Sequence, residues 1–178
     1  HARWLVAGIL IAFCVVSLKL ASDDAVTMDE RAHIPASWSY VKYLDMRVNP
    51  EHPPLLKDLA GLSMLAANPN FSFPYNSDLW KNGDTNVIPT DHPEGTAKSW
   101  GLAQWEFGVK FLFGSGNNPD TIAFAARLPI ILVGILLCFM VYLWTRELAG
   151  VSAGLFALLL IAADPNMLGH SHYVTTDV

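Results

Sequence analysis

Three long runs of apolar residues carry no charged side chain, apart from Lys19 near the end of the first run. A helix that crosses a bilayer needs about 20 mostly apolar residues, with a range of roughly 17 to 25. The pattern therefore predicts three membrane spans, at residues 4–20, 128–145 and 148–163, and a long loop of residues 21–120 after the first. We expect one membrane domain with an all-α fold, a polytopic membrane helix bundle. A soluble protein with buried core helices is the alternative interpretation.

The long loop begins with a segment that has the spacing of an amphipathic helix. Between residues 29 and 45, apolar side chains recur at the interval of one helical face. They are Ile34, Trp38, Val41 and Leu44. The hydroxyl group of Thr27 can cap this helix, and Glu30, three residues further on, completes a capping box. The sequence therefore predicts a helix over residues 29–45.

Two more helices are predicted later in the loop. Pro53 and Pro54 precede a helix expected over residues 55–67, because proline is tolerated in a first helical turn. Residues 68–99 are rich in Asn, Pro, Asp, Gly and Thr and are expected to be irregular. A further helix is expected over residues 100–113, and its aromatic residues and its lysine are typical of a helix that lies in the membrane interface. Its predicted apolar side carries Trp105, Val109, Leu112 and Phe113.

Composition and charge agree with a membrane protein and indicate how it is oriented. The 178 residues are 52% hydrophobic and only 15% charged, and the net charge of −5 argues against nucleic-acid binding. Arg3 precedes the first span, and Arg146 lies in a predicted tight turn at residues 145–147 between the second and third spans. Since short basic loops tend to be cytoplasmic, the N-terminus and this turn are expected inside. The long loop and the tail from Asp164 are then outside.

Asp29 and Glu30 are adjacent carboxylates at a helix start, just after the first span. The helix dipole favours acidic side chains at such a position, which offers a purely structural explanation. The functional alternative is a general base just outside the membrane, with a neighbour that orients the substrate. Glu30 and His33 also have the spacing that places two metal ligands on one helical face, although such a site needs further ligands from elsewhere.

His52 is surrounded by prolines that hold the backbone in an extended conformation before the second loop helix. Lys57 lies about one turn into that helix, near an N-terminus that attracts anions. A phosphate group at this place would meet backbone N–H groups, the helix dipole and an ammonium group together. The alternative is a stiff surface turn with a solvated lysine.

The polar tail after the third span returns to the loop side, so Asp177 could meet Asp29 at one membrane surface. His170 and His172 in this tail fit either a metal site or an ordinary polar loop. Arg127 lies at the outer end of the second span, where a cation is costly unless it has an anionic partner or extends to the interface. We expect it to extend to the interface.

Four motifs follow one another in a defined order. They are Asp29-Glu30, the His-Pro-Pro-Leu-x-Lys motif from His52 to Lys57, the Arg-Leu-Pro motif at Arg127, and Thr176-Asp177. In this order the motifs resemble the N-terminal part of C-type glycosyltransferases, most closely the dolichyl-phosphate-mannose protein mannosyltransferases and their bacterial relatives. The resemblance covers nearly the whole chain, which we therefore interpret as the N-terminal part of a longer enzyme.

The resemblance implies a multi-pass membrane enzyme with interfacial helices in its first outer loop. Such enzymes take a sugar from a polyprenyl-phosphate carrier and pass it, with inversion, to a hydroxyl group of a protein, glycan or lipid acceptor outside the cytoplasm, as in protein glycosylation. The bacterial cytoplasmic membrane is favoured over the endoplasmic reticulum. The chain alone would lack most of the donor groove and would be inactive.

The resemblance also implies roles for individual residues. Asp29 would be the general base that acts on the acceptor hydroxyl, and Glu30 would help to orient the acceptor. The implied contacts of the donor phosphate are His52, Lys57 and Arg127. Asp177 would be a further acidic residue near the same site.

Two other classes of function remain open from the residues alone. The chain could be a non-catalytic membrane subunit whose outer loop binds a partner protein. It could also belong to a membrane enzyme that depends on a divalent metal and uses Glu30, His33 and His52.

Overall fold

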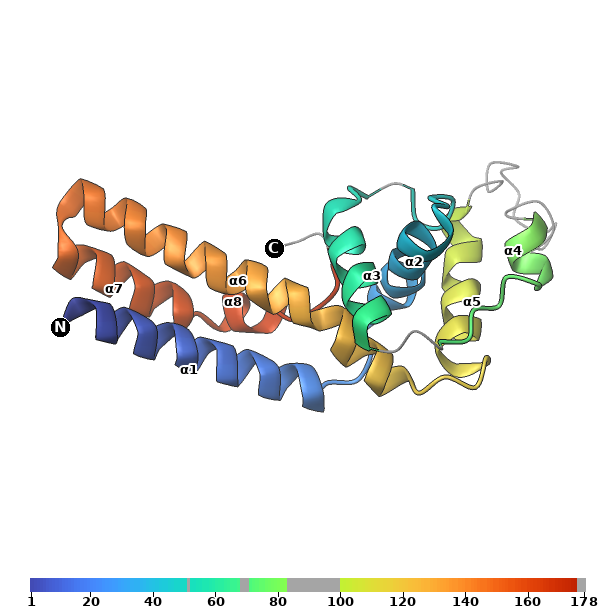
Figure 1. Cartoon of the computed structure of the whole chain (residues 1–178), viewed down its shortest axis with the longest axis horizontal. Coiled ribbons are helices and arrows are strands. Elements are labelled where there is room, and N and C mark those ends of the chain that lie inside the picture. The colour runs from blue at the N-terminus through green and yellow to red at the C-terminus, as the bar shows by residue number, and fades with distance from the viewer. Residues whose placement is uncertain (51, 68–70, 83–99, 176–178) are drawn as a thin grey trace. The chain divides into compact units, whose positions relative to one another are not determined.

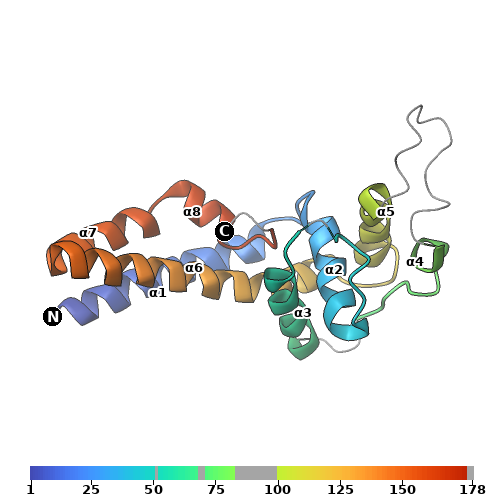
Figure 2. The ribbon, with the colours of Figure 1, turned by 90° about the horizontal axis from the view of Figure 1, so that it is seen from above.

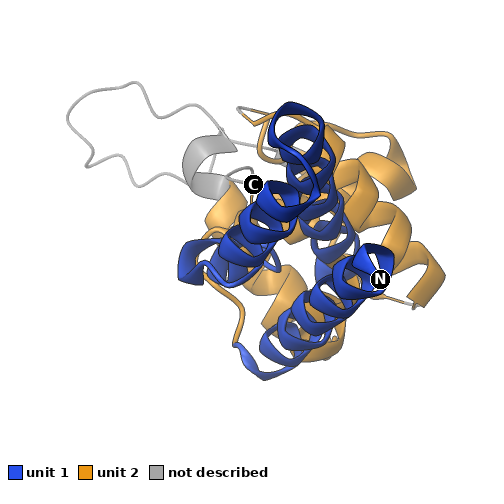
Figure 3. Ribbon diagram, turned by 90° about the vertical axis from the view of Figure 1, so that its left-hand side faces the viewer, with its two compact units in different colours: residues 1–24, 127–173, 177–178 blue, residues 25–126, 174–176 orange. Residues whose placement is uncertain are grey.

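The computed structural model describes residues 1–50, 52–67, 71–82 and 100–175, and the regular elements in these ranges are all α-helices (Figure 1). In chain order they are α1 (Ala2–Asp23), α2 (Glu30–Tyr43), α3 (Leu55–Ala67), α4 (Asp78–Asn82), α5 (Trp100–Phe113), α6 (Pro119–Ala149), α7 (Val151–Ala162) and α8 (Pro165–His170). Of the described residues, those in 1–24 and 127–173 form one compact unit, unit 1. Those in 25–126, with 174 and 175, form unit 2, and Figure 3 colours the two units separately.

Unit 1 consists of α1, α7, α8 and the part of α6 that begins at Arg127. The helices α1, α6 and α7 run side by side in both Figure 1 and Figure 2. They share a core of buried side chains: Val6, Phe13, Cys138, Tyr142, Leu158 and Ala162. Many apolar side chains on the outer faces of these helices remain exposed, as Trp4 and Trp144 do.

Two helices in the described ranges are long and apolar enough to cross a membrane. These are α1, with 22 residues, and α6, with 31 residues. They correspond to the first two predicted spans. The helix α6 starts at Pro119, well before the predicted boundary at residue 128, because the residues that precede the apolar run continue the same helix. At a rise of about 1.5 Å per residue, both helices are longer than the hydrocarbon core of a bilayer, which is about 30 Å thick.

The third predicted span, residues 148–163, is wrong as a membrane-length helix. The helix α7 has only 12 residues, which at about 1.5 Å per residue reach about 18 Å. The chain reverses at Gly150, which has a φ of +88°. The turn predicted at residues 145–147 is therefore misplaced, because these residues belong to α6. The left-handed conformation at Gly150 is one that glycine adopts without steric cost. At the other end, the Asp164 side chain accepts a hydrogen bond from the Met167 N–H (2.9 Å) and caps α8.

In unit 2, α2 lies between α3 and α5 in Figures 1 and 2. Nearly every residue from Ala32 to Tyr40 is buried, so α2 is covered on all sides and not on one face only. The predicted helices at residues 55–67 and 100–113 are confirmed by α3 and α5. Both hydrogen bonds of the predicted capping box are present, since Thr27 Oγ1 accepts from the Glu30 N–H (3.4 Å) and Glu30 Oε2 accepts from the Thr27 N–H (3.0 Å). The helix predicted over residues 29–45 is α2, which begins at Glu30 after Asp29 and ends at Tyr43.

The described residues 71–82 contain aromatic side chains that pack on α5. The ring of Phe73 lies at 5.0–5.5 Å, centroid to centroid, from the rings of Trp80, Phe107 and Phe111. The short helix α4 lies within residues 68–99, which were predicted to be irregular. Residues 68–70 and 83–99 lie outside the described residues.

The predicted apolar side of α5 is divided between the core and the surface. Leu112 is buried, together with Phe107 and Phe111, whereas Val109 is 41% exposed and Phe113 is 56% exposed. A neighbouring face of α5 therefore packs into the core, and an apolar strip with Val109 and Phe113 lies at the surface of unit 2. That strip is compatible with the predicted position in the membrane interface.

Candidate functional site

The two carboxylates at the start of α2 have opposite environments. The side chain of Asp29 is exposed and accepts no hydrogen bond from the described residues, while Glu30 is completely buried. Besides Thr27, the Glu30 carboxylate binds the backbone N–H of Val174, which donates to Oε1 (3.2 Å). Because buried carboxylates require hydrogen-bond donors, Glu30 holds the chain near residue 174 against the start of α2. This contact joins segments 144 residues apart within unit 2.

Glu30 therefore has a structural task that explains its burial. Its role in orienting an acceptor stays a prediction. Asp29, in contrast, directs its carboxylate outward from the first turn of a helix that is fixed in place by its neighbour. Asp177 lies outside the described residues, so its predicted place near Asp29 stays a prediction.

The histidines of unit 2 come together. The rings of His33 on α2 and His52 lie 5.0 Å apart, centroid to centroid, with an angle of 61° between their planes. His33 is buried and His52 is exposed. In the described ranges, no three His, Cys, Asp or Glu side chains are grouped closely enough to hold a metal ion, so the set of Glu30, His33 and His52 does not form such a group.

Lys57 is buried to 1% exposure in α3, and its ammonium group is surrounded by oxygen atoms. It donates to the backbone oxygen of Asn49 (2.6 Å), to the side-chain oxygen of Asn49 (2.8 Å) and to the hydroxyl group of Tyr40 (3.1 Å). The amide of Asn49 donates in turn to Gln104 Oε1 (2.8 Å). This network connects α2, α3 and α5 through the turn that precedes His52, and it could not be read from the spacing of the residues. Lys57 was expected to be solvated or to bind a phosphate, but in the structure its ammonium group is buried and binds oxygen atoms of the protein itself.

Asn49 is held by this network in a conformation that few residues adopt. Its φ of 56° lies in the left-handed region, where asparagine is one of the few tolerated residues. Both the backbone oxygen and the side-chain oxygen of Asn49 bind Lys57. Lys57 thereby fixes the start of the proline-rich segment that carries His52.

Arg127 belongs to unit 1 and is also buried, with 1% of its surface exposed. The expectation that it extends to the membrane interface is wrong. Its guanidinium group donates from one nitrogen to the carbonyl oxygens of Ala21 (2.9 Å) and Asp24 (2.8 Å) and lies over the ring of Tyr173 (5.3 Å). The last carbonyl groups of a helix lack intrahelical partners and favour a cation. Arg127 supplies that cation at the end of α1.

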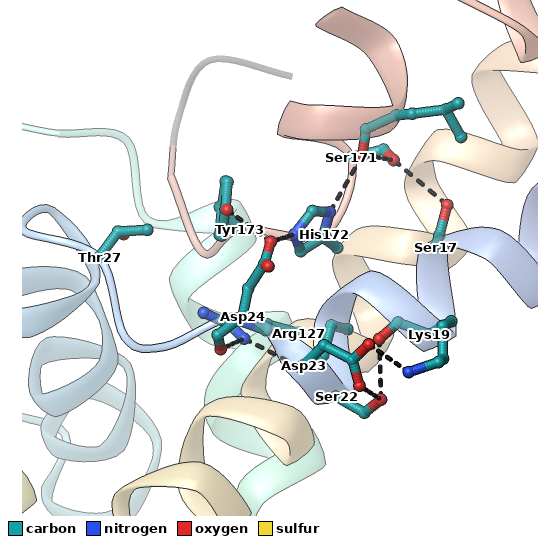
Figure 4. A network of polar contacts seen from close by, with 12 residues as sticks. Ser17, Lys19, Ser22, Asp23, Asp24, Thr27, Arg127, Ser171, His172 and Tyr173 are labelled. Atoms are coloured by element: carbon teal, nitrogen blue, oxygen red, sulfur yellow. Dashed lines mark hydrogen bonds and ion pairs between the residues drawn. The ribbon is translucent and has the colours of Figure 1, made fainter. Parts of the chain in front are cut away.

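Asp24 lies at the centre of a polar cluster in unit 1 that the sequence did not reveal (Figure 4). Its Oδ2 accepts from the hydroxyl group of Tyr173 (2.7 Å) and lies 3.0 Å from Nε2 of the buried His172. Nδ1 of His172 faces the backbone oxygen of Leu168 (3.0 Å). Both ring nitrogens of His172 therefore lie within hydrogen-bond distance of oxygen atoms of the protein. Of the two histidines in the tail, His172 therefore forms its contacts within the protein.

The hydrogen bond from Tyr173, followed by the contacts with His172, lowers the pKa of Asp24 below its ordinary value. A carboxyl group with a depressed pKa stabilises the fold above its unfolded pKa, and this contribution is lost as the pH falls through the folded value. We therefore expect Asp24→Asn to destabilise unit 1 by a constant amount above about pH 5, with the difference from wild type shrinking as the pH falls below about 4, the ordinary pKa of an aspartate. Thermal unfolding of the whole chain in mild detergent from pH 3 to 7 would measure this.

A second variant separates the carboxylate from general effects of acid. Tyr173→Phe removes the largest cause of the low pKa, so its acid transition should move to higher pH than that of the wild type. Parallel pH profiles for the wild type and both variants would contradict the role of Asp24.

Of the predicted site residues, Asp29, Glu30, His52 and Lys57 lie in unit 2, and Arg127 lies in unit 1. Asp29 and Glu30 are neighbours at one helix start, and Lys57 reaches the turn before His52.

Comparisons with protein-family models, with curated proteins and with solved structures find no match to this chain.

Proposed function

We propose that this chain is part of a multi-pass membrane glycosyltransferase of the C type, which transfers a sugar from a polyprenyl-phosphate carrier to an acceptor hydroxyl group outside the cytoplasm. The observation that carries the proposal is the exposed carboxylate of Asp29, placed beside the fully buried Glu30. Two helices long enough to span a bilayer are compatible with a lipid-linked donor. We place the enzyme in a bacterial cytoplasmic membrane, with the residues of unit 2 outside.

Asp29 acts as the general base in this proposal. A carboxylate can serve as a base when it lies within hydrogen-bond reach of the hydroxyl group that it deprotonates. The acceptor hydroxyl transfers its proton to Asp29 while its oxygen forms a bond to the anomeric carbon. The bond from that carbon to the phosphate oxygen breaks, and polyprenyl phosphate leaves with the electron pair.

Glu30 is a positioning residue for this base. Its carboxylate accepts three hydrogen bonds from Thr27 and Val174, and its backbone N–H donates one to Thr27, so the start of α2 next to Asp29 is fixed. The departing phosphate gains negative charge, which preorganised cations stabilise. His52 offers an exposed ring in unit 2 whose N–H group can donate a hydrogen bond to the phosphate. Lys57 contributes by holding the turn before His52.

The proposal is tested by measuring release of polyprenyl phosphate, which needs no knowledge of the acceptor. Membranes that contain the intact gene product would be incubated with undecaprenyl-phosphate-linked mannose, glucose or galactose. We expect release from at least one donor, and Asp29→Asn should reduce its rate by a factor of about 100 or more, since general bases contribute roughly 10²–10⁴-fold.

Asp78→Asn is the matched control, because Asp78 is an exposed aspartate in the first turn of α4. It should leave the rate unchanged. Release at the wild-type rate from Asp29→Asn membranes would rule out the proposed base. A stoichiometric partner protein, together with no release from any donor, would favour a non-catalytic subunit instead.

A further inference from the structure

Unit 1 contains a groove of about 570 Å³ at the end where α1 and α7 begin and α6 ends. Its walls are apolar and include Val6, Leu10, Phe139 and Leu143. Two cations, Arg3 and Arg146, line the same groove. These are the two arginines whose positions in the sequence predict a cytoplasmic location for this end of the helices.

The charge of this groove is entirely positive. No carboxylate is among its lining residues, and neither arginine forms an ion pair within the described part of the chain. Arg3 lies over the ring of Trp4 at 5.3 Å, and Arg146 is exposed. Two like charges on an apolar wall are unfavourable unless an anion lies near them. The groove therefore has the charge that complements one anionic group.

The surroundings of the groove are suited to lipid. Trp4 and Leu5, next to Arg3, are 69% and 57% exposed, and Leu143 and Leu10 extend the apolar wall along the helices. Tryptophan and arginine together are typical of the level of the headgroups in a bilayer. A groove of this volume is within the range of roughly 300–1,000 Å³ that holds small ligands.

We propose that this groove binds an anionic phospholipid of the cytoplasmic leaflet, with the lipid phosphate between Arg3 and Arg146 and an acyl chain along Val6, Leu10 and Phe139. Basic pockets between membrane helices on the cytoplasmic side are known to bind anionic headgroups. This inference rests on the membrane location of α1 and α6 and is independent of sugar transfer. It also explains why the two arginines line one apolar groove of unit 1.

A second apolar groove, in unit 2, is less suited to the same ligand. It has a volume of about 610 Å³ and contains Arg31 and Lys110, but also the carboxylate of Glu106. Its mixed charge does not complement a single anion, whereas the charge of the groove in unit 1 does.

Native mass spectrometry of the whole chain, released from detergent micelles, can test the proposal. The probes are a phospholipid with a phosphatidylglycerol headgroup, a phosphatidylcholine with the same acyl chains, and inorganic phosphate. We expect one phosphatidylglycerol to remain bound with higher affinity than phosphatidylcholine. The double variant Arg3→Gln/Arg146→Gln should bind it about 30-fold more weakly, about fivefold for each cation lost.

The control variant Lys42→Gln/Lys81→Gln removes two exposed cations of unit 2 and should leave the affinity unchanged. Ala7→Phe, which fills the groove without changing its charge, should weaken both phospholipids. Equal binding of the two phospholipids by the wild type would overturn the proposal, and so would an unaltered affinity in the double arginine variant. Competition by millimolar inorganic phosphate would identify a site for free anions instead. None of these readouts depends on the sugar donor, so they can fail while the glycosyltransferase proposal holds.

Discussion

Replacing Gly108 by alanine is expected to destabilise unit 2 by about 3 kcal/mol, because α5 can no longer approach α2. A Cβ atom at Gly108 would lie 1.8 Å from the carbonyl oxygen of Arg31 and 2.7 Å from its carbonyl carbon. These are backbone atoms of a buried helix, so no side-chain rotation can relieve the clash. The helices would have to separate, and the contacts of Phe107 and Phe111 with the aromatic cluster would loosen.

The close approach at Gly108 has a cause in the sequence of α2. Pro35 lies inside this helix and has no N–H group, so the carbonyl of Arg31, four residues earlier, lacks its intrahelical donor. A glycine can bring its backbone against that carbonyl, where a Cα–H group can make a weak contact with the oxygen. The proline of one helix and the glycine of another thus form one packing feature.

Amide hydrogen exchange of the whole chain in detergent would measure the effect, as faster exchange in α2 and α5. Gly8→Ala is the control, since a Cβ atom at Gly8 meets nothing within 4 Å. In that helix the change from glycine to alanine should be neutral or stabilising by up to about 1 kcal/mol. Similar exchange rates for Gly108→Ala and wild type would show that α5 is not held against α2 in this way.

The helices that the sequence predicts well are those whose limits are set locally. Pro53 and Pro54 place the start of α3 at Leu55, and the capping box of Thr27 and Glu30 places the start of α2. Such signals depend on residues within one turn of each other, so they can be read from the sequence alone. The limits of α3 and α5 agree with the prediction at both ends.

The third predicted span is longer than the helix that the structure has there, because hydropathy alone set its limits. Hydropathy counts apolar residues, but helix length also depends on where the backbone turns. The glycine at position 150 and the Asp164-Pro165 pair shorten the third apolar run to 12 residues of helix. Glycine after a helix and an aspartate followed by proline before the next helix are local signals of helix limits. These two signals, and not the hydropathy, predict the observed length of α7.

The polar contacts of the candidate site could not be predicted, because they join distant parts of the chain. His172 and Asp24 are 148 residues apart, and Val174 and Glu30 are 144 apart. Sequence spacing identified Asp29, Glu30 and His52 as notable, yet it could not separate the exposed carboxylate from the buried one. That distinction arises from packing, and it is what favours Asp29 as the base.

Replacing Lys57 by methionine is expected to destabilise unit 2 by about 3 kcal/mol. The change keeps the length of the side chain but removes the ammonium group, so both oxygens of Asn49 and the hydroxyl group of Tyr40 lose a buried donor. Asn49 would then be free to leave its left-handed conformation, and the segment that carries His52 would lose its fixed start. Thermal unfolding in detergent and amide exchange in α3 would measure the loss. Lys42→Met, at an exposed position in the last turn of α2, should have little effect.

The same variant decides between two roles for Lys57. If the lysine acts by positioning, Lys57→Met should lose stability, and its release of polyprenyl phosphate should fall in proportion to the unfolded fraction and to the displacement of His52. If the lysine instead contacts the donor phosphate directly, the variant should fold like the wild type and bind the donor more weakly. The network of three hydrogen bonds around a fully buried ammonium group favours the first result, because a lysine that binds phosphate needs its N–H groups for the ligand.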